Sequence, residues 1–356
     1  MTQDQGSDVR AARSKTGATF ALRVTTALAV GAMAAAGLGA CSGDAKPTAL
    51  PATPTATPTP TPSPTPIGTN PLTGVGAPPT GPVIAVKVDD TAAGRPSMGL
   101  EKADVIYIEE VEGGLTRMVA VFASAKPKVR AVRSIRSSDP ELLAQYGKIT
   151  VVASGGGRQA IQTLDRSSLH SVINDRGQVG FSRDRSRPAP YNVVSDLAKV
   201  SAAVKADGVR NVGFNWAKSD RRLAGATAAT TVSTRVGSTS VGFVWDAKLG
   251  RYVRTVAGQP ILTVSGEQLA KPNVLVQFCQ IIADRNDHDV NGNPTMYTKS
   301  VGSGKVVLFR GGKQINGKWS RSSAGAPTEF TDNAGKPLLF APGGTFVALA
   351  RIGAPV

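Results

Sequence analysis

The chain has 356 residues, with 41 Lys or Arg against 25 Asp or Glu, so its formal net charge is +16. Two histidines and two cysteines leave almost no material for zinc sites, histidine-based catalytic triads or a disulfide framework. The length allows two modest domains at the usual ~100–200 residues each.

Residues 1–40 have the pattern of a lipoprotein signal peptide. Basic residues precede an apolar run, 24–40, which ends in Leu38-Gly39-Ala40 directly before Cys41. This run is shorter than the ~20 residues that a bilayer-spanning helix needs, although a permanent N-terminal anchor helix is the alternative. We expect cleavage after Ala40 and diacylglycerol on Cys41, which would hold the protein at the outer face of the cytoplasmic membrane. Cleavage removes four basic and two acidic residues, so 37 basic and 23 acidic residues remain, a net charge of +14.

Residues 41–69 form a predicted Thr/Pro-rich stalk. The part from Pro47 to Pro66 contains only Pro, Thr, Ala, Ser and Leu, so it cannot build a core. Repeated Thr-Pro favours extended polyproline geometry, a semi-rigid spacer whose threonines could carry sugars. The signal, the stalk and the Gly/Ala/Arg-rich composition are typical of an actinobacterial, high-GC Gram-positive source.

Residues 70–225 are predicted to form an N-terminal α/β domain with a mixed sheet, because apolar strand-like runs alternate with short helical patterns. The expected strands are 82–88, 103–108, 115–122 and 149–153, and the expected helices are 140–146 and 158–164.

Residues 226–356 are predicted to form a smaller, mostly β domain, so the fold class is α+β. Short apolar or alternating runs separated by turn signals carry this prediction. The expected strands are 230–235, 240–246, 251–256, 260–264, 273–283, 303–309, 317–321 and 345–352. A single continuous α+β domain is the alternative. Cys279 lies in the apolar run 273–283, and we expect it to be a small buried hydrophobe.

A series of short motifs recurs along both halves in a fixed order. They are Val83–Asp89, Arg95-Pro96, Gly99-Leu100, Ala103–Tyr107, Val111–Arg117, Val132–Arg136, Tyr252–Arg254, Asn273–Gln277, Gly302–Gly304, Gly317–Trp319 and Pro342–Thr345. In this order the sequence resembles the YerB-like bacterial lipoproteins over nearly all of residues 70–356. The resemblance implies an envelope lipoprotein of two domains with no assigned molecular function. Where that family often has Pro-His-Asn, this chain has Pro190-Tyr191-Asn192, which puts a histidine general base in doubt.

Arginines and carboxylates gather in the first half of the chain. The acids are Asp89, Asp104, Glu109 and Glu112, and the arginines are Arg95, Arg117, Arg133, Arg136, Arg183, Arg185 and Arg187. Arginine is favoured where planar, bidentate contact with carboxylate or phosphate is needed. We predict an anion-binding pocket that includes Arg95, Arg117, Arg133, Ser134 and Arg136. Structural Arg–carboxylate pairs, with Asp104 and Glu112 as partners, explain the same residues equally well.

Two loops add weaker signals. Residues 149–158 are predicted to form a strand, a glycine turn with Gly155 and Gly156, and the start of a helix. Backbone N–H groups at such a helix start can bind an anion, although a plain tight turn explains the same residues. The series Asp287, Asp289, Asn291 opens like a calcium loop, but Thr298 stands where a bidentate Glu is expected, so a polar hairpin loop is favoured over a metal site. No motif indicates a cofactor.

The leading prediction is a non-catalytic, lipid-anchored module that binds an anionic cell-wall polymer or small ligand, or an envelope protein partner. The rival is an envelope hydrolase or transferase that uses Asp89 and Glu112 as acid and base with an arginine clamp. A passive scaffold is a third class. Nucleic acid is not expected as a ligand. The protein is predicted to be exported, only 5% of its residues are aromatic, and no nucleic-acid-binding helix motif is recognisable.

Overall fold

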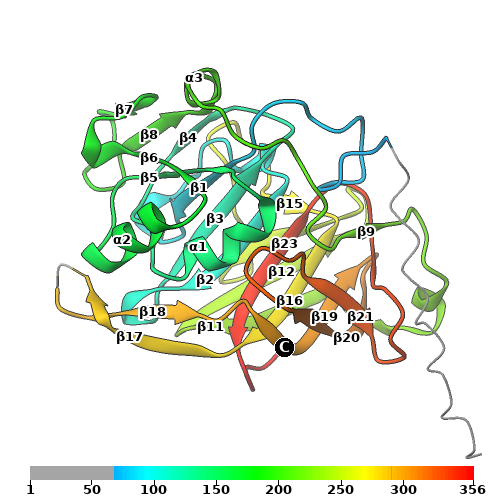
Figure 1. Cartoon of the computed structure of the whole chain (residues 1–356). Helices are drawn as coiled ribbons and strands as arrows, with labels where there is room; N and C mark the ends of the chain where they lie inside the picture. The colour runs from blue at the N-terminus through cyan, green and yellow to red at the C-terminus, as the bar shows by residue number, and fades with distance from the viewer. Residues whose placement is uncertain (1–67, 290) are drawn as a thin grey trace, which may run out of the picture. The chain divides into compact units, whose positions relative to one another are not determined.

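A single large sheet runs through both halves of the computed structural model, which describes residues 68–289 and 291–356. It has eleven strands in the order β10-β20-β19-β16-β23-β2-β3-β1-β5-β6, with β21 paired to β20 (Figure 1). Its strands are β1 (Ile84–Asp89), β2 (Val105–Glu110), β3 (Thr116–Phe122), β5 (Thr150–Ala153), β6 (His170–Ile173), β10 (Thr227–Ala228), β16 (Asn273–Cys279), β19 (Gly302–Arg310), β20 (Lys313–Arg321), β21 (Glu329–Asp332) and β23 (Thr345–Arg351).

The helices and the smaller sheets lie around this large sheet. The helices are α1 (Asp139–Leu143), α2 (Arg158–Arg166) and α3 (Leu197–Ala203). One antiparallel sheet consists of β11 (Thr231–Val236), β12 (Thr239–Asp246), β13 (Arg251–Val256), β14 (Gln259–Pro260) and β15 (Ala270–Lys271). The remaining strands are β4 (Lys128–Arg130), β7 (Phe181–Arg183), β8 (Val193–Asp196), β9 (Asn215–Trp216), β17 (Ile281–His288), β18 (Pro294–Thr298) and β22 (Leu339–Phe340). The mixed sheet in the N-terminal region and the antiparallel sheet in the C-terminal region confirm the predicted α+β class.

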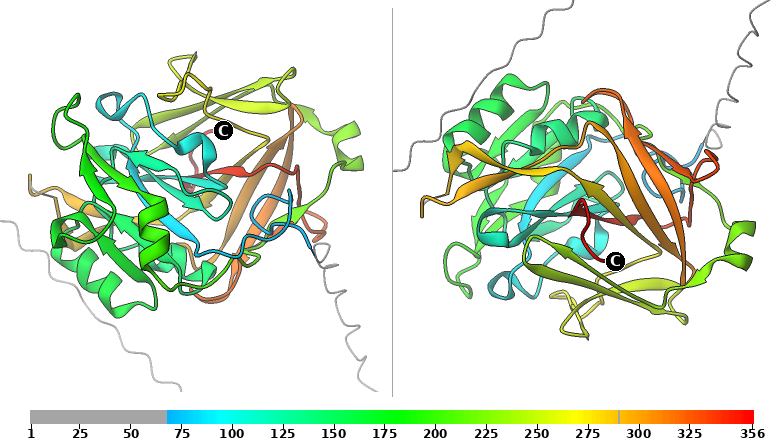
Figure 2. Two further views of the ribbon diagram at one scale, coloured as in Figure 1. Left: turned by 90° about the horizontal axis from the view of Figure 1, so that it is seen from above. Right: turned by 90° about the horizontal axis from the view of Figure 1, so that it is seen from below.

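Both faces of the large sheet are covered, which explains why β1 and β2 are buried along their whole length. Alternate residues of a strand point to opposite faces. Ala85 and Tyr107 pack with α1 and α2, whereas Val86 and Ile106 pack with α3 and the β11–β13 layer. Figure 2 shows the β11–β13 layer on the side of the large sheet opposite to α1 and α2.

The last strand, β23, joins the two halves of the chain. It runs parallel to β2 on one side and to β16 on the other, with Val347 opposite both Tyr107 and Leu275. Six of its seven residues are buried. Removing this strand would expose apolar surface in both halves at once, so the halves depend on each other for their cores.

The carboxyl ends of six strands meet at one edge of the large sheet. Strands β1, β5 and β6 are mutually parallel, β3 runs antiparallel to both β1 and β2, and β2, β23 and β16 are again parallel. In open sheets with parallel strands, ligands bind outside such carboxyl ends. This edge holds most of the arginines and acids that the sequence analysis singled out.

Most predicted elements are present, with two differences. The expected strand 273–283 is interrupted at Gln280. β16 pairs with β19 as far as Gln277 and with β23 as far as Cys279, whereas β17 leaves the sheet to pair with β18. The expected strand 260–264 is reduced to β14 and isolated bridges. Leu262 and Val264 are each 49% exposed, so their apolar character does not reflect a core position.

Candidate functional site

The end of β1 places two successive carboxylates on opposite faces of the large sheet. The Asp89 side chain lies on the face of α1 and α2, where its Oδ2 is 3.3 Å from Arg117 Nη1. The Asp90 side chain lies on the opposite face, where its Oδ2 is 3.1 Å from Arg254 Nη2 and accepts a hydrogen bond from Thr116. This alternation is what an extended chain requires. One pair of residues therefore organises two separate charge clusters.

Asp89 is the centre of the cluster on the α1 and α2 face, which we call the arginine cluster: Asp89, Glu112, Arg117, Arg133 and Arg136. Asp89 is fully buried, and Oδ1 accepts hydrogen bonds from the backbone and hydroxyl of Thr91. Its Oδ2 lies 3.7 Å from Arg133 Nε as well as beside Arg117. A buried carboxylate with two arginines holds both guanidinium groups at fixed positions.

Glu112 and Arg136 form the second pair of the cluster. Glu112 follows β2 in a short 3-10 turn and accepts a hydrogen bond from Arg136 Nη2. Arg136 also donates through Nη1 to the carbonyl of Ser134 at 2.8 Å. Burial alone would raise the pKa of Glu112, but the hydrogen bond and charge of Arg136 outweigh it and lower the pKa below its usual value. Glu112 is therefore ionised at neutral pH.

Arg133 is the least constrained arginine of the cluster. Its side chain is 19% exposed, and its guanidinium lies 5.3 Å from the centre of the Tyr191 ring, a cation–π contact. Its side chain makes no hydrogen bond within residues 68–289 and 291–356, and Nη1 is buried without a hydrogen-bond partner. Arg95, another predicted member of the pocket, belongs to the Asp90 cluster instead: its Nη2 is 3.5 Å from Asp90 Oδ1, and its carbonyl accepts from Arg187. Arg133 thus presents an oriented positive charge with hydrogen-bonding capacity left over.

The glycine turn after β5 is occupied by other side chains of the protein. Gly157 precedes α2, and a Cβ added there would overlap the carboxylate of Asp287, coming within 2.8 Å of its Cγ. A Cβ on Gly155 would overlap the carboxylate of Asp175 in the same way. The backbone of the turn is held by Ile135, whose N–H donates to the carbonyl of Gly155 at 2.9 Å. Gly156 is exposed and forms an isolated bridge with Ile135.

Asp287 reaches this turn from the β17–β18 hairpin, and Asp287 Oδ2 is buried without a hydrogen-bond partner. Burial and the nearby charge of Asp284 raise the pKa of Asp287 above its usual value, while Arg136 opposes this shift. The hairpin therefore covers the space between the glycine turn and the arginine cluster.

The predicted calcium-loop residues lie in and beside the β17–β18 turn. Asp289 accepts hydrogen bonds from the backbone N–H of Asn291 and of Asn293, so its carboxylate closes the turn. In the part of the chain that the structure describes, no three His, Cys, Asp or Glu side chains are grouped so that they could hold a metal ion.

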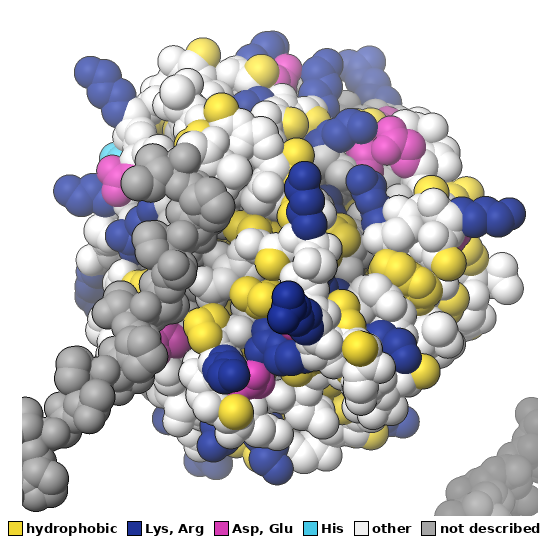
Figure 3. Space-filling model, turned by 90° about the vertical axis from the view of Figure 1, so that its right-hand side faces the viewer, with side chains coloured by type: hydrophobic (Ala, Val, Ile, Leu, Met, Phe, Trp, Pro, Cys, Tyr) yellow, Lys and Arg dark blue, Asp and Glu magenta, His cyan; other side chains and the backbone are white. Residues whose placement is uncertain are grey.

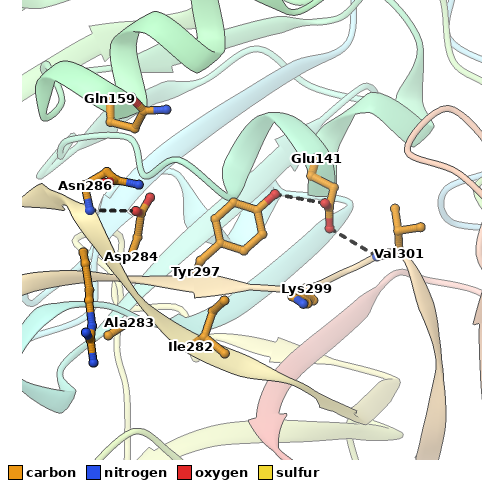
Figure 4. A pocket seen from close by; sticks show the side chains of 10 residues that line it. Glu141, Gln159, Ile282, Ala283, Asp284, Asn286, Tyr297, Lys299 and Val301 are labelled. Atoms are coloured by element: carbon orange, nitrogen blue, oxygen red, sulfur yellow. Dashed lines mark hydrogen bonds between the residues drawn. The ribbon is translucent and has the colours of Figure 1, made fainter.

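A groove of about 680 Å3 lies between the β17–β18 hairpin and the helices α1 and α2 (Figure 4). Tyr297 crosses its centre and donates a 2.9 Å hydrogen bond to Glu141 Oε2. Glu141 Oε1 accepts from the backbone N–H groups of Ser300 and Val301. Asp284 in the groove wall accepts from Ser137, the residue next to Arg136, so the groove lies beside the arginine cluster.

The two cysteines have different standings. Cys279 is buried, and burial raises the pKa of its thiol to about 12, so it stays protonated and unreactive at neutral pH. Cys41, the predicted signal peptide and the predicted stalk up to residue 67 lie outside the described residues. Among residues that the structure describes, no helix is long and apolar enough to cross a membrane.

The structure brings together five of the residues named from the sequence: Asp89, Glu112, Arg117, Arg133 and Arg136. Other members of the constellation have other partners. Glu109 lies opposite Arg117 in the β2–β3 ladder but pairs with Lys87. Asp104 accepts from the backbone of Ala123 at 2.6 Å instead of pairing with an arginine. The exposed Arg183 donates to Asn192.

Sequence reasoning missed Tyr191 and Asp287 as neighbours of the cluster. Tyr191 carried a signal, because it stands where the resembling family often has histidine. For Asp287 the sequence indicated only a weak calcium-loop pattern, and its contact with Gly157 could not be predicted because the two residues are 130 positions apart in the chain.

With this geometry established, comparisons define the family. Residues 72–210 match the N-terminal domain and residues 231–347 the C-terminal domain of a protein family of unknown function, DUF3048. The chain belongs to this two-domain family. It is 26% identical over 273 residues to "Putative lipoprotein YerB" of Bacillus subtilis (strain 168), an alignment that covers 74% of this chain and 80% of that protein. The crystal structure of the YerB protein from Bacillus subtilis has the same fold, with a TM-score of 0.66 and 22% identity over 79% of this chain and 96% of that one.

Proposed function

We propose that the protein is a lipid-anchored module of the bacterial cell envelope that binds an anionic ligand at the exposed side of the arginine cluster. The phosphates or carboxylates of a cell-wall polymer are the ligand chemistry that fits. The observation that carries this proposal is the Arg133 side chain, a partly exposed guanidinium that lies beside Asp89 and Tyr191 but makes no hydrogen bond with any residue that the structure describes. An arginine held in this way binds an oxyanion without a large ordering cost.

The charge of the whole chain supports this proposal. On the face that Figure 3 shows, Lys and Arg side chains are spread over the whole surface and acidic side chains are few. A distributed positive charge attracts polyanions from a distance, and salt weakens that attraction. The electrostatic field of the distributed positive charges would attract an anionic polymer to the protein surface. Arg133 would then make a specific contact with it.

The same geometry makes Glu112 a poor general acid. The hydrogen bond and charge of Arg136 lower its pKa and keep it ionised, and Asp89 is fully buried beside two arginines. A general acid needs a proton to give near neutral pH. We therefore favour binding over hydrolysis.

We expect Arg133→Ala to weaken binding of a purified anionic wall polymer by about 10- to 100-fold, since a hydrogen bond to a charged group is worth about 1.5–3 kcal/mol. The matched control is Arg235→Ala, which removes one exposed positive charge on β11 far along the chain. Binding by the full chain in detergent would be measured over a salt series. Equal losses in the two variants would mean that only net charge matters and would reject a defined site.

The lipid anchor is tested separately. Cys41→Ser should abolish incorporation of labelled fatty acid and leave the protein in its uncleaved form, because diacylglycerol is attached through the Cys41 thiol. Fatty-acid labelling that persists in Cys41→Ser would contradict the anchor.

A further inference from the structure

The groove between the β17–β18 hairpin and helices α1 and α2 has features of a ligand site that are independent of the arginine cluster. Its volume of about 680 Å3 lies in the range of small-molecule sites. Tyr297 and Ile282 are opposite each other in the hairpin ladder, so their side chains share one face. Figure 4 shows the Tyr297 ring across the middle of the groove, with Asp284 and Asn286 on one side and Glu141 on the other.

The polar groups around this ring are mostly unengaged. The side chains of Gln159, Asn286, Arg285 and Lys299 make no hydrogen bond or ion pair within the described residues. Glu141 and Asp284 are held in place by Tyr297, by Ser137 and by backbone N–H groups. The groove therefore combines an aromatic surface with fixed acceptors and free donors.

The lining of the groove has no excess of either charge. It includes two acidic residues, Glu141 and Asp284, and two basic residues, Arg285 and Lys299, so the formal charges cancel. This balance favours an uncharged ligand that both donates and accepts hydrogen bonds and has an apolar face for Tyr297. Hydroxyl groups around a ring with exposed C–H bonds meet all of these demands.

We propose that this groove binds an uncharged sugar unit of a glycan chain, with one ring face packed on Tyr297 and the hydroxyls bonded to Asn286, Gln159 and Asp284. An open groove between a hairpin and two helices can accept a sugar within a chain. This proposal is independent of the proposed anion site, because none of the groove residues belongs to the arginine cluster.

The test is calorimetric titration of the full chain in detergent with cellotetraose and chitotetraose, two uncharged oligosaccharides. We expect binding of at least one with a Kd of about 0.1–1 mM, the range of weak single-site contacts. Tyr297→Ala should weaken binding at least about tenfold, whereas Tyr297→Phe, which keeps the ring and loses the hydrogen bond to Glu141, should stay within about threefold of wild type.

A second variant is needed because Tyr297→Ala can lose binding through a folding defect. Asn286→Ala removes an exposed side chain without hydrogen-bond partners in the described chain and should weaken binding while the protein remains folded. Arg133→Ala should leave the affinity for these sugars unchanged, which separates this groove from the anion site. Absence of heat with both sugars up to about 10 mM, or binding that survives both Tyr297→Ala and Asn286→Ala, would overturn the proposal.

Discussion

Asp90→Ala should lower the free energy of unfolding by about 3–5 kcal/mol, the range seen when one partner of a buried ion pair is removed. Arg254 is 1% exposed, and Asp90 is its carboxylate partner at 3.1 Å. The Thr116 hydroxyl also donates a hydrogen bond to Asp90, and Arg95 Nη2 lies 3.5 Å from Asp90 Oδ1. Without Asp90, the Arg254 guanidinium would remain buried and unpaired between β1 and β13. Denaturant unfolding of the purified variant measures the loss.

Two companion variants identify the cause of that loss. Asp165→Ala breaks the exposed pair of Asp165 and Arg176 and should cost only about 0–1 kcal/mol. Adding Arg254→Met to Asp90→Ala should recover part of the stability, because no charge is then left buried alone. If Asp90→Ala were no worse than Asp165→Ala, burial of the Asp90–Arg254 pair would not account for its effect on stability.

Gly157→Ala should destabilise the protein by about 1–3 kcal/mol, the usual effect of forcing an extra carbon into a packed site. The backbone of Gly157 has φ −60°, which any residue adopts, so backbone strain does not enter. The penalty comes from overlap of the new Cβ with the Asp287 carboxylate, which would push the β17–β18 hairpin away from α2. Thermal unfolding and hydrogen exchange of the hairpin amides report the effect.

The control for this prediction is a double-mutant cycle. Asp287→Ala removes all three atoms that the new Cβ would meet, so Gly157→Ala should cost little in that background. Equal costs in both backgrounds would show that the hairpin does not rest on the glycine turn.

Local patterns were enough to predict most of the strands. The apolar runs that became β1, β2, β3 and β5 are buried on both faces, so the runs are continuous and easily recognised. The helix starts near residues 140 and 158 were predicted for the same local reason, since Pro140 favours a first turn and glycines precede Arg158. Short strands such as β7, β9 and β22 have two or three residues and carry no periodic pattern.

Long-range pairing could not be read from these patterns. The run that became β23 was recognisable as a strand, but its place between β2 and β16 depends on contacts across most of the chain. For the same reason the sequence left open whether Glu112 would pair with an arginine or act as a catalytic acid or base. The sequence identifies the charged residues, but tertiary packing determines which of them are in contact.

Only the structure shows which arginines bond to the protein itself and which one does not. The side chains of Arg117, Arg136 and Arg254 donate hydrogen bonds to acceptors of the protein itself, although the Nε of each is buried without a hydrogen-bond partner. The Arg133 side chain donates none within the described chain. A buried arginine bonded to the protein stabilises the fold, and a partly exposed one without such bonds is suited to a ligand. The candidate site is thus smaller than the constellation that the sequence offers.

The measurement that tests the central claim most directly is a titration of residues 68–356 with inorganic phosphate, followed through the Nε–Hε correlation of Arg133 in an arginine-labelled sample. We predict a saturable shift of the Arg133 signal that salt reverses, while the signal of the buried Arg254 stays in place. An Arg133 signal that does not move, or that moves only in parallel with the exposed Arg235, would contradict an anion site at the arginine cluster.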